Sequence, residues 1–279
     1  MTIKLGVNSV LFSNFDFATA ARQIALAGYD GIEIAAIKGM CEHLVLDNWQ
    51  EQANEIKSIV EENELEILSM EVASLDEDRI KLAVEAAEGI GIPVINVGSG
   101  GKTGNEEDLK ESIQMLEKLS ELANSHGVTL CVKAHVGAAI YNTPTTLRAM
   151  EEIKSEGFGI DMDPSHIYRG NENPEEELPK VLERVKHIHI RDCQGPAEEV
   201  YHEQHNITGV GPGDITQQTP GRGDIDLYKY CQAMVDGNYS GPVCLEVIGA
   251  NNHSLADVSI VAAESYGYLN AILKHLGAR

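Results

Sequence analysis

Short apolar runs alternate with amphipathic segments along the whole chain, and this alternation is the feature that most restricts how the chain can fold. Each apolar run is rich in β-branched residues and is bounded by Gly, Pro or polar residues, which is typical of a buried β-strand. The sequence therefore predicts eight strands, at residues 4–8, 31–34, 65–71, 93–97, 128–133, 158–163, 187–191 and 243–247.

The segments between these strands carry apolar residues at the spacing of one helix face. Asp47 and Asp76 are expected to cap two of the helices, and Gly28, Gly91 and Gly127 stand where helices are expected to end. The predicted helices are residues 17–27, 48–62, 76–89, 106–125, 145–154, 174–184, 227–236 and 256–276.

Eight strands, each followed by a helix, predict one α/β domain over residues 1–279, a single (β/α)8 TIM barrel. An open, doubly wound sheet is the alternative, because the order of strands in a sheet cannot be read from the sequence. The chain contains 43% hydrophobic residues, enough for a large core. One long connection, residues 193–224, follows a strand and would lie on the active face of a barrel, so we expect it to act as a lid.

The formal net charge of −23 restricts the partners of the protein. Binding to nucleic acid or to an anionic membrane needs clustered Lys and Arg, so we expect neither partner. The N-terminus lacks the apolar region of a signal peptide, no apolar run is long enough to span a bilayer, and the five cysteines are scattered. A cytoplasmic protein with a small-molecule carbohydrate substrate is expected, and a homo-oligomer is compatible with the sequence.

Every predicted strand ends in polar side chains, which in a barrel would meet at the mouth of the active site. A structural strand end would more often carry a turn residue or an apolar one, so eight polar ends in a row indicate a functional site. In chain order the residues are Asn8, Glu33, Glu71, Asn96, Lys133 with His135, Asp163 with His166, His189 with Arg191, and Glu246.

Two neighbouring strands carry paired candidates for a metal site. His187 and His189 lie on one face of their strand, as do Asp161 and Asp163, because side chains alternate along a strand. The later member of each pair lies nearer the mouth, which favours His189 and Asp163 as ligands. The inner pair is expected to support the ligands or to lie in the core. Together with Glu246, these nitrogen and oxygen donors suit Mn, Zn, Co or Fe(II).

Several short motifs make the chain similar to a known family. They are Lys4-Leu-Gly-Val-Asn-Ser, Gly28-Tyr-Asp-Gly-Ile-Glu33, Gly127-Val-Thr-Leu, Asp163-Pro-Ser-His166, His187-Ile-His-Ile-Arg-Asp192, Gly221-Arg-Gly-Asp-Ile-Asp226 and Leu245-Glu246. Over nearly its whole length the chain resembles the xylose isomerase-like superfamily of sugar and sugar-phosphate isomerases and epimerases, which also includes the endonuclease IV type.

This resemblance implies that Glu, Asp, His and Glu from the fifth to the eighth strands hold one divalent metal ion. Asp163, His189 and Glu246 match the last three ligands, and His166 matches a histidine that contacts the substrate or a further ion. Lys133 stands at the place of the first ligand, which is also one of the family's two catalytic carboxylates. The ion would be Mn, Zn, Co, Fe or Mg.

The lysine leaves three outcomes open. His135, two residues later on the same face, would replace the missing ligand. Alternatively, Lys133 would act as a catalytic base or bind an anion, with its pKa lowered by burial or by a neighbouring metal. In the third outcome the chain has lost metal binding, and Lys133 forms an ion pair with Asp163.

The predicted site follows from these assignments. Two basic groups on opposite faces of a substrate would move a proton at the carbon next to a carbonyl. The predicted catalytic residues are Glu246, Lys133 and His135. The predicted metal ligands are Asp163, His189, Glu246 and His135. The predicted substrate contacts are His166, Arg191, Glu33, Asn8 and His43.

A metal-dependent isomerase or epimerase of a sugar or sugar phosphate is therefore the predicted function. A metal-dependent hydrolase or lyase, or an aldolase that forms a Schiff base through Lys133, is the main alternative. An endonuclease IV-like nuclease and a non-catalytic sugar-binding barrel are further alternatives, and the acidic net charge disfavours the nuclease.

Overall fold

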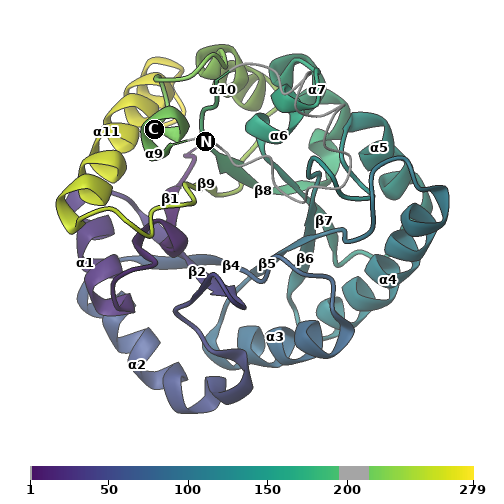
Figure 1. Ribbon diagram of the computed structural model, residues 1–279, viewed down its shortest axis with the longest axis horizontal. Helices are drawn as coiled ribbons and strands as arrows, with labels where there is room; N and C mark the ends of the chain where they lie inside the picture. The colour runs from purple at the N-terminus through teal and green to yellow at the C-terminus, as the bar shows by residue number, and fades with distance from the viewer. Residues whose placement is uncertain (1, 195–213) are drawn as a thin grey trace.

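The computed structural model describes residues 2–194 and 214–279 and shows a closed barrel of parallel strands surrounded by helices (Figure 1). The barrel strands are β1 (Leu5–Asn8), β2 (Gly31–Ile37), β4 (Glu66–Glu71), β5 (Val94–Gly98), β6 (Thr129–Lys133), β7 (Phe158–Met162), β8 (Val185–Ile190) and β9 (Val243–Leu245). They pair in the order β1-β9-β8-β7-β6-β5-β4-β2, and β1 also pairs with β2, which closes the ring. The predicted TIM barrel is confirmed, and the open sheet is excluded.

A short hairpin extends one of the barrel strands. β2 continues to Ile37, past the predicted end at residue 34, and β3 (Cys41–Glu42) pairs with it in the antiparallel direction. Ala36 lies opposite Glu42 in this pairing. The hairpin was not predicted from the sequence because β3 is too short to carry an alternating pattern.

All eight predicted helices form, with ends within a few residues of the predicted ones. They are α1 (Phe17–Ala27), α2 (Trp49–Glu62), α3 (Glu77–Ile90), α4 (Glu106–Ser125), α5 (Thr143–Glu152), α7 (Pro174–Val181), α10 (Leu227–Asp236) and α11 (Leu255–His275). The described chain also contains α6 (Pro164–Arg169), α9 (Ile215–Gln218) and the 3-10 turns η1 (Ser9–Phe12), η2 (Leu46–Asn48) and η3 (Leu182–Arg184).

The predicted helix boundaries depend on local hydrogen bonds. The Asp76 carboxylate accepts the backbone N–H of Arg79 at the start of α3, and Gly91 ends that helix with a φ of 93°. Asp47 does not cap α2 as predicted, because it lies within η2 and Asn48 occupies the cap position.

The helices bury their apolar faces against the outside of the barrel, and the core is mostly aliphatic. Ile32, Ile95, Leu130 and Ile160 on the strands are fully buried. Burial of this surface supplies most of the free energy that holds helices and sheet together.

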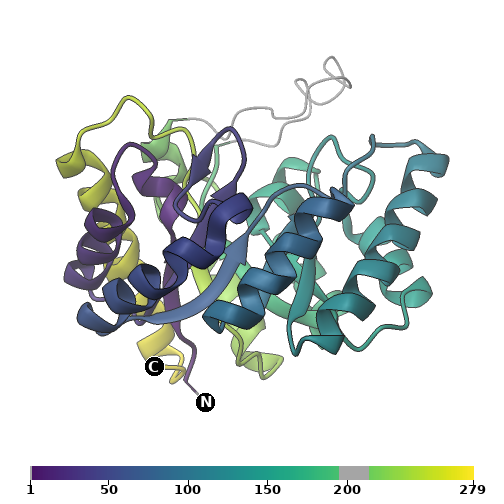
Figure 2. The same ribbon diagram turned by 90° about the horizontal axis from the view of Figure 1, so that it is seen from below.

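Both termini lie at the same end of the barrel (Figure 2). The backbone N–H of Ile3 donates to the carbonyl of Ala278 at 2.9 Å, and Arg279 pairs with Asp30. Since β1 leads away from the N-terminus and its barrel partners run parallel to it, the carboxyl ends of the strands meet at the opposite end. Active sites of TIM barrels are built at that end.

The predicted lid, residues 193–224, lies largely outside the described residues, and only its two ends, with α9, are described. Among the helices of the described chain, none is long and apolar enough to cross a membrane. All five cysteines are free and buried.

Substitutions of two glycines test how tightly the barrel strands are packed. A Cβ atom at Gly31 would lie 2.5 Å from the carbonyl oxygen of Glu66, on the neighbouring strand. Gly31→Ala should therefore lower the free energy of unfolding by about 1–3 kcal/mol. The control Gly267→Ala, inside α11 with no atom within 4 Å of the new Cβ, should raise it by about 0.5–1 kcal/mol. Urea unfolding measures both, and equal effects would contradict this account of the packing.

Candidate active site

A cavity of about 130 Å³ opens at the carboxyl ends of the barrel strands. Glu71 ends β4, Lys133 ends β6, Arg191 follows β8 and Glu246 follows β9, and all four line the cavity. A concave site with a few convergent polar groups and apolar walls is the usual form of a small-molecule site. The other lining residues are Ile37, Met40, Ala73, Gly98, His135, His166 and Ile248.

The ammonium group of Lys133 lies among three carboxylates. Its Nζ atom is 2.7 Å from Oε1 of Glu246, 3.3 Å from Oε1 of Glu71 and 3.9 Å from Oδ2 of Asp161. Burial alone would lower the pKa of Lys133, but the charges of Glu246 and Glu71 outweigh it and raise this pKa above its usual value. This direction favours a charged Lys133, in contrast to the lowered pKa of the second outcome considered from the sequence.

Arg191 is a second buried cation beside the first. Its Nη1 atom is 3.3 Å from Oε2 of Glu246, and its Nη2 atom is 3.1 Å from Oδ2 of Asp163. Nη2 also donates to Nε2 of His166 at 2.8 Å, and Nε donates to the Ser165 hydroxyl at 2.8 Å. Glu246 thus has one cation against each of its two oxygens.

Glu71 and Glu246 face the same cavity, and their pKa values are shifted in opposite directions. Burial and the neighbouring charge of Glu246 raise the pKa of Glu71 to about 8. Burial would raise the pKa of Glu246 too, but the charges of Lys133 and His189 hold it well below its usual value. A pair of carboxyl groups whose pKa values are pushed apart in this way is the usual mark of an acid and a base.

A second layer of polar side chains lies beneath the cavity, inside the barrel. His189 Nε2 is 2.5 Å from Oε2 of Glu33, and its Nδ1 is 2.6 Å from Oδ2 of Asp161. Burial would lower the pKa of His189, but these two carboxylates raise it well above its usual value. The imidazole is therefore charged, and both of its nitrogens are held by carboxylates.

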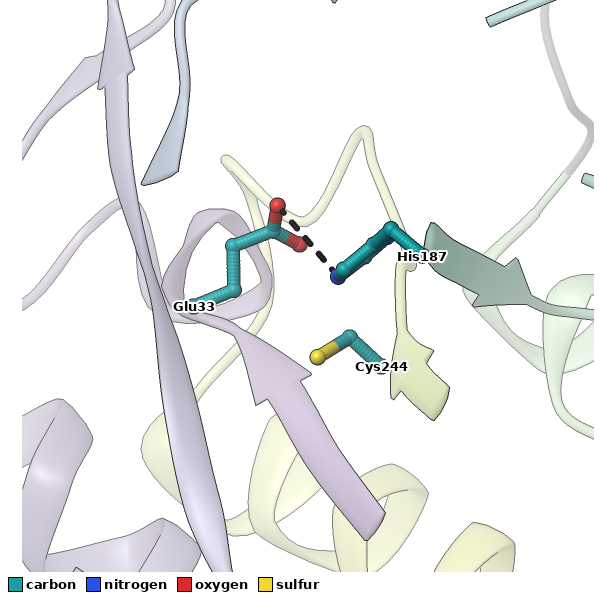
Figure 3. Close-up of side chains that lie close together, drawn as sticks. All are labelled: Glu33, His187 and Cys244. Atoms are coloured by element: carbon teal, nitrogen blue, oxygen red, sulfur yellow. Dashed lines mark ion pairs between the residues drawn. The ribbon is translucent and has the colours of Figure 1, made fainter. Parts of the chain in front are cut away.

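His187 lies deeper still, between Asp161 and Ser69. Its Nδ1 is 3.0 Å from Oδ1 of Asp161, and its Nε2 is 2.9 Å from the Ser69 hydroxyl. Figure 3 shows its ring pointing toward Glu33 of β2 and Cys244 of β9, with 3.9 Å between Nε2 and Oε1 of Glu33. The sequence-based expectation that His187 and Asp161 form an inner pair agrees with this arrangement.

Three groups of donor atoms in the described chain are close enough to hold a metal ion, with the atoms of each group within 4.8 Å of one another. At the cavity, the charges present do not fit one. In the group at the cavity, Lys133 contacts both carboxylates, and His189 offers no free nitrogen. The three groups are Glu71–His189–Glu246, Asp161–His187–His189 and Glu33–His187–Cys244.

The four ligands predicted from the sequence do not converge as one set. Asp163 caps α6 by accepting from the backbone and hydroxyl of Ser165, and Arg191 pairs with its other oxygen. His135 lines the cavity, but its ring lies against His166, 4.0 Å between ring centres, and Nδ1 is 2.7 Å from the Val136 carbonyl. The predicted ion pair between Lys133 and Asp163 is replaced by the pair between Lys133 and Glu246.

The predicted substrate contacts divide into three places. His166 and Arg191 line the cavity. Glu33 and Asn8 lie beneath it, where Glu33 contacts His189 and Asn8 donates to Oε2 of Glu71 at 2.5 Å. His43 is outside the cavity wall, because its Nε2 pairs with the Phe15 carbonyl at 2.9 Å and its ring lines a separate surface hollow.

Sequence reasoning assigned no role to Glu71, and it placed Asp161 only as an inner partner. The signal for Glu71 was present, since it is the last residue of a strand in the run of polar strand ends. Its partners could not be read from the sequence, because Lys133 is 62 residues away along the chain.

Comparison with known proteins agrees with the fold. The family described as "Xylose isomerase-like TIM barrel" matches residues 21–266. An inosose dehydratase of Clostridium perfringens is 25% identical over 278 residues, covering 88% of this chain and 89% of that protein. One of Clostridium beijerinckii is 26% identical over 268 residues, with the same two coverages.

Two solved structures are similar in fold at lower identity. A D-allulose 3-epimerase of Methylomonas sp. has a TM-score of 0.75 and 16% identity, covering 98% of each chain. A probable 3-DHS dehydratase of Bacillus anthracis has a TM-score of 0.75 and 17% identity, covering 95% of this chain and 98% of that one.

The burial of Lys133 predicts a large effect of its removal on stability. Lys133→Met leaves the carboxylates around it without a cation, which should lower the free energy of unfolding by about 3–5 kcal/mol. The control is Lys118→Met, since Lys118 pairs with Glu77 at the same 2.7 Å but is 60% exposed. Urea unfolding should show little change for this exposed pair. Similar losses in the two variants would contradict the account of Lys133.

Proposed function

The chain belongs to the xylose isomerase-like TIM-barrel family, and within that family we propose that it removes the proton next to a carbonyl in a small polyhydroxy compound and then expels a hydroxyl group as water. One observation carries the proposal. Lys133 stands between Glu246, whose pKa is lowered, and Glu71, whose pKa is raised, at the wall of the cavity. Base, acid and fixed positive charge are the groups that this reaction needs.

The first step is proton transfer from carbon to Glu246. The substrate's carbonyl oxygen lies near Lys133 and Arg191, whose charges stabilise the negative charge that develops on it. Sharing Lys133 with the substrate oxygen weakens the ion pair of Glu246 and makes its carboxylate more basic. Glu246 takes the proton, and the electron pair of the C–H bond moves onto the oxygen.

The second step is loss of the neighbouring hydroxyl group. Glu71 donates its proton to that hydroxyl, the C–O bond breaks, and water leaves as the electron pair returns from the oxygen. A carboxylic acid that is still protonated at neutral pH suits this role. The inosose dehydratases that align with most of this chain support dehydration over other outcomes for the same intermediate.

Epimerisation is the second candidate, and it is the outcome that the sequence predicted. Glu71 on β4 and Glu246 after β9 are separated around the barrel by β1 and β2, so they can face opposite sides of a bound substrate. Glu71 would then return a proton to carbon instead of to a hydroxyl. The Schiff-base alternative is disfavoured, because it needs an unprotonated lysine and the pKa of Lys133 is raised.

Measurement of proton exchange distinguishes the proposed roles of the two carboxyl groups. In D₂O, the wild-type protein should exchange the proton next to the carbonyl of an inosose or a ketose, followed by NMR. Glu246→Gln should slow this exchange by about 10²–10⁴-fold, since it removes the base. Glu71→Gln should keep the exchange and lose the later product, because the amide cannot donate an acidic proton.

Glu264→Gln is the matched control, because Glu264 pairs with Arg222 on the surface and should leave both rates unchanged. Unsaturated product identifies dehydration, and an epimer identifies epimerisation. Wild-type protein that exchanges no proton across a panel of cyclic and open-chain polyhydroxy ketones would contradict the proposed function.

The rate of product formation should depend on pH through Glu71. Its pKa of about 8 means that the acid form is present below this pH and is lost as the pH rises through it. Product formation should therefore fall above about pH 8. Proton exchange by Glu71→Gln, measured over the same range, should lack this fall, and a fall that persists in the variant would assign the titration to another group.

A further inference from the structure

We infer that the Lys133 ammonium, together with the Arg191 guanidinium, takes the place of a divalent metal in this barrel, so that the site binds substrate oxygen with its own cations and takes up no ion. The metal predicted from the family resemblance then has no place at the cavity. The role in binding substrate oxygen rests on the proposed function, whereas the exclusion of an ion does not.

The charges at the cavity oppose a bound metal ion. Lys133 contacts Glu246 and Glu71, two of the three residues in the donor group at the cavity. An ion bound to those carboxylates at ordinary metal–oxygen distances of about 2.0–2.2 Å would lie close to a positive ammonium group. Two like charges a few ångströms apart in a buried site repel strongly. The third residue of the group, His189, has Nε2 2.5 Å from Glu33 and Nδ1 2.6 Å from Asp161, so both of its nitrogens already contact carboxylates.

Arg191 contacts the remaining oxygens of the predicted carboxylate ligands. It lies against the oxygen of Glu246 that Lys133 leaves free, and against Asp163, which the resemblance makes a ligand. A guanidinium is not deprotonated in proteins, so it does not yield these oxygens to a metal. Every carboxylate that the sequence predicted as a ligand is thus paired with a cation of the chain itself.

Buried polar groups beside the two cations can bind a ligand in the cavity. Arg191 is 1% exposed, and its Nη1 atom contacts Oε2 of Glu246 at 3.3 Å without a hydrogen bond to any described residue. His166 is 2% exposed, and its Nδ1 atom has no hydrogen-bond partner within the described residues. Both residues line the cavity beside Lys133. A buried ring nitrogen without a partner, beside two cations in a cavity, indicates a ligand with oxygen acceptors. A carbonyl oxygen that gains negative charge fits this position.

Metal content tests the inference without any substrate. Wild-type protein is incubated separately with excess Mn²⁺, Co²⁺ and Zn²⁺, desalted and measured by elemental analysis, and Glu246→Gln is treated in the same way. We expect the two proteins to retain equal amounts of ion. If the wild type retains about one ion per chain that Glu246→Gln lacks, the ion is held at the cavity and the inference is overturned.

Substitution of Lys133 tests the inference in the opposite direction, because removal of the cation should allow the site to bind an ion. Lys133→Glu exchanges the cation for an oxygen ligand and should gain about one ion per chain, lost again when Glu246→Gln is added. Lys133→Arg, which keeps the charge, should gain none. If Lys133→Glu does not fold, Lys133→Gln removes the charge with less added repulsion and should gain weaker binding by titration calorimetry. A folded variant of neutral or negative charge at this position that binds no more ion than the wild type would overturn the inference.

Proton exchange measured with a chelator connects the inference to activity. Proton exchange by the wild type should be unchanged in EDTA, and loss of exchange that is restored by one divalent ion would overturn the inference. If the wild type exchanges no proton under any condition, the proposed function fails while the metal measurements still decide whether the site takes an ion.

Discussion

The ion pair between Lys133 and Glu246 is the interaction on which the rest of the site depends. Both side chains are almost completely buried at the carboxyl end of the barrel, where neither charge is stable without the other. A buried pair of this kind is weak evidence for extra stability, because the desolvation of both groups opposes their attraction. Its main consequence is the placement of two groups, because the pair holds a cation and a base at the wall of the cavity.

The charges below this pair alternate across the barrel interior. Lys133 is followed by Asp161, then by the charged ring of His189, and then by Glu33. Each group holds its neighbour in the charged state, so the protonation states form one coupled set. Glu71 lies farther from Lys133 than Glu246 does, and burial together with the charge of Glu246 raises its pKa to about 8. The proposed acid and base therefore differ both in their distance to one lysine and in the direction of their pKa shifts.

Most of the fold could be predicted from the sequence because strands and helices depend on local patterns, whereas much of the site could not. The polar strand ends and the unusual position of Lys133 were visible, but not its partners, which depend on the register of strands far apart in the chain. Asp163 was expected at the mouth, yet Pro164 and Ser165 begin α6 there and turn its carboxylate into a helix cap. Asp161, two residues earlier on the same face of the strand, contacts both histidines of β8 instead.

The central claim is that a protein cation stands where related barrels are expected to hold a metal. The most direct measurement is anomalous diffraction from crystals of the wild-type protein grown with excess Mn²⁺. The account predicts electron density for the Lys133 ammonium between Glu71 and Glu246, with no manganese peak within bonding distance of either carboxylate. A manganese peak bound to Glu246, with the lysine side chain turned away from it, would contradict the account.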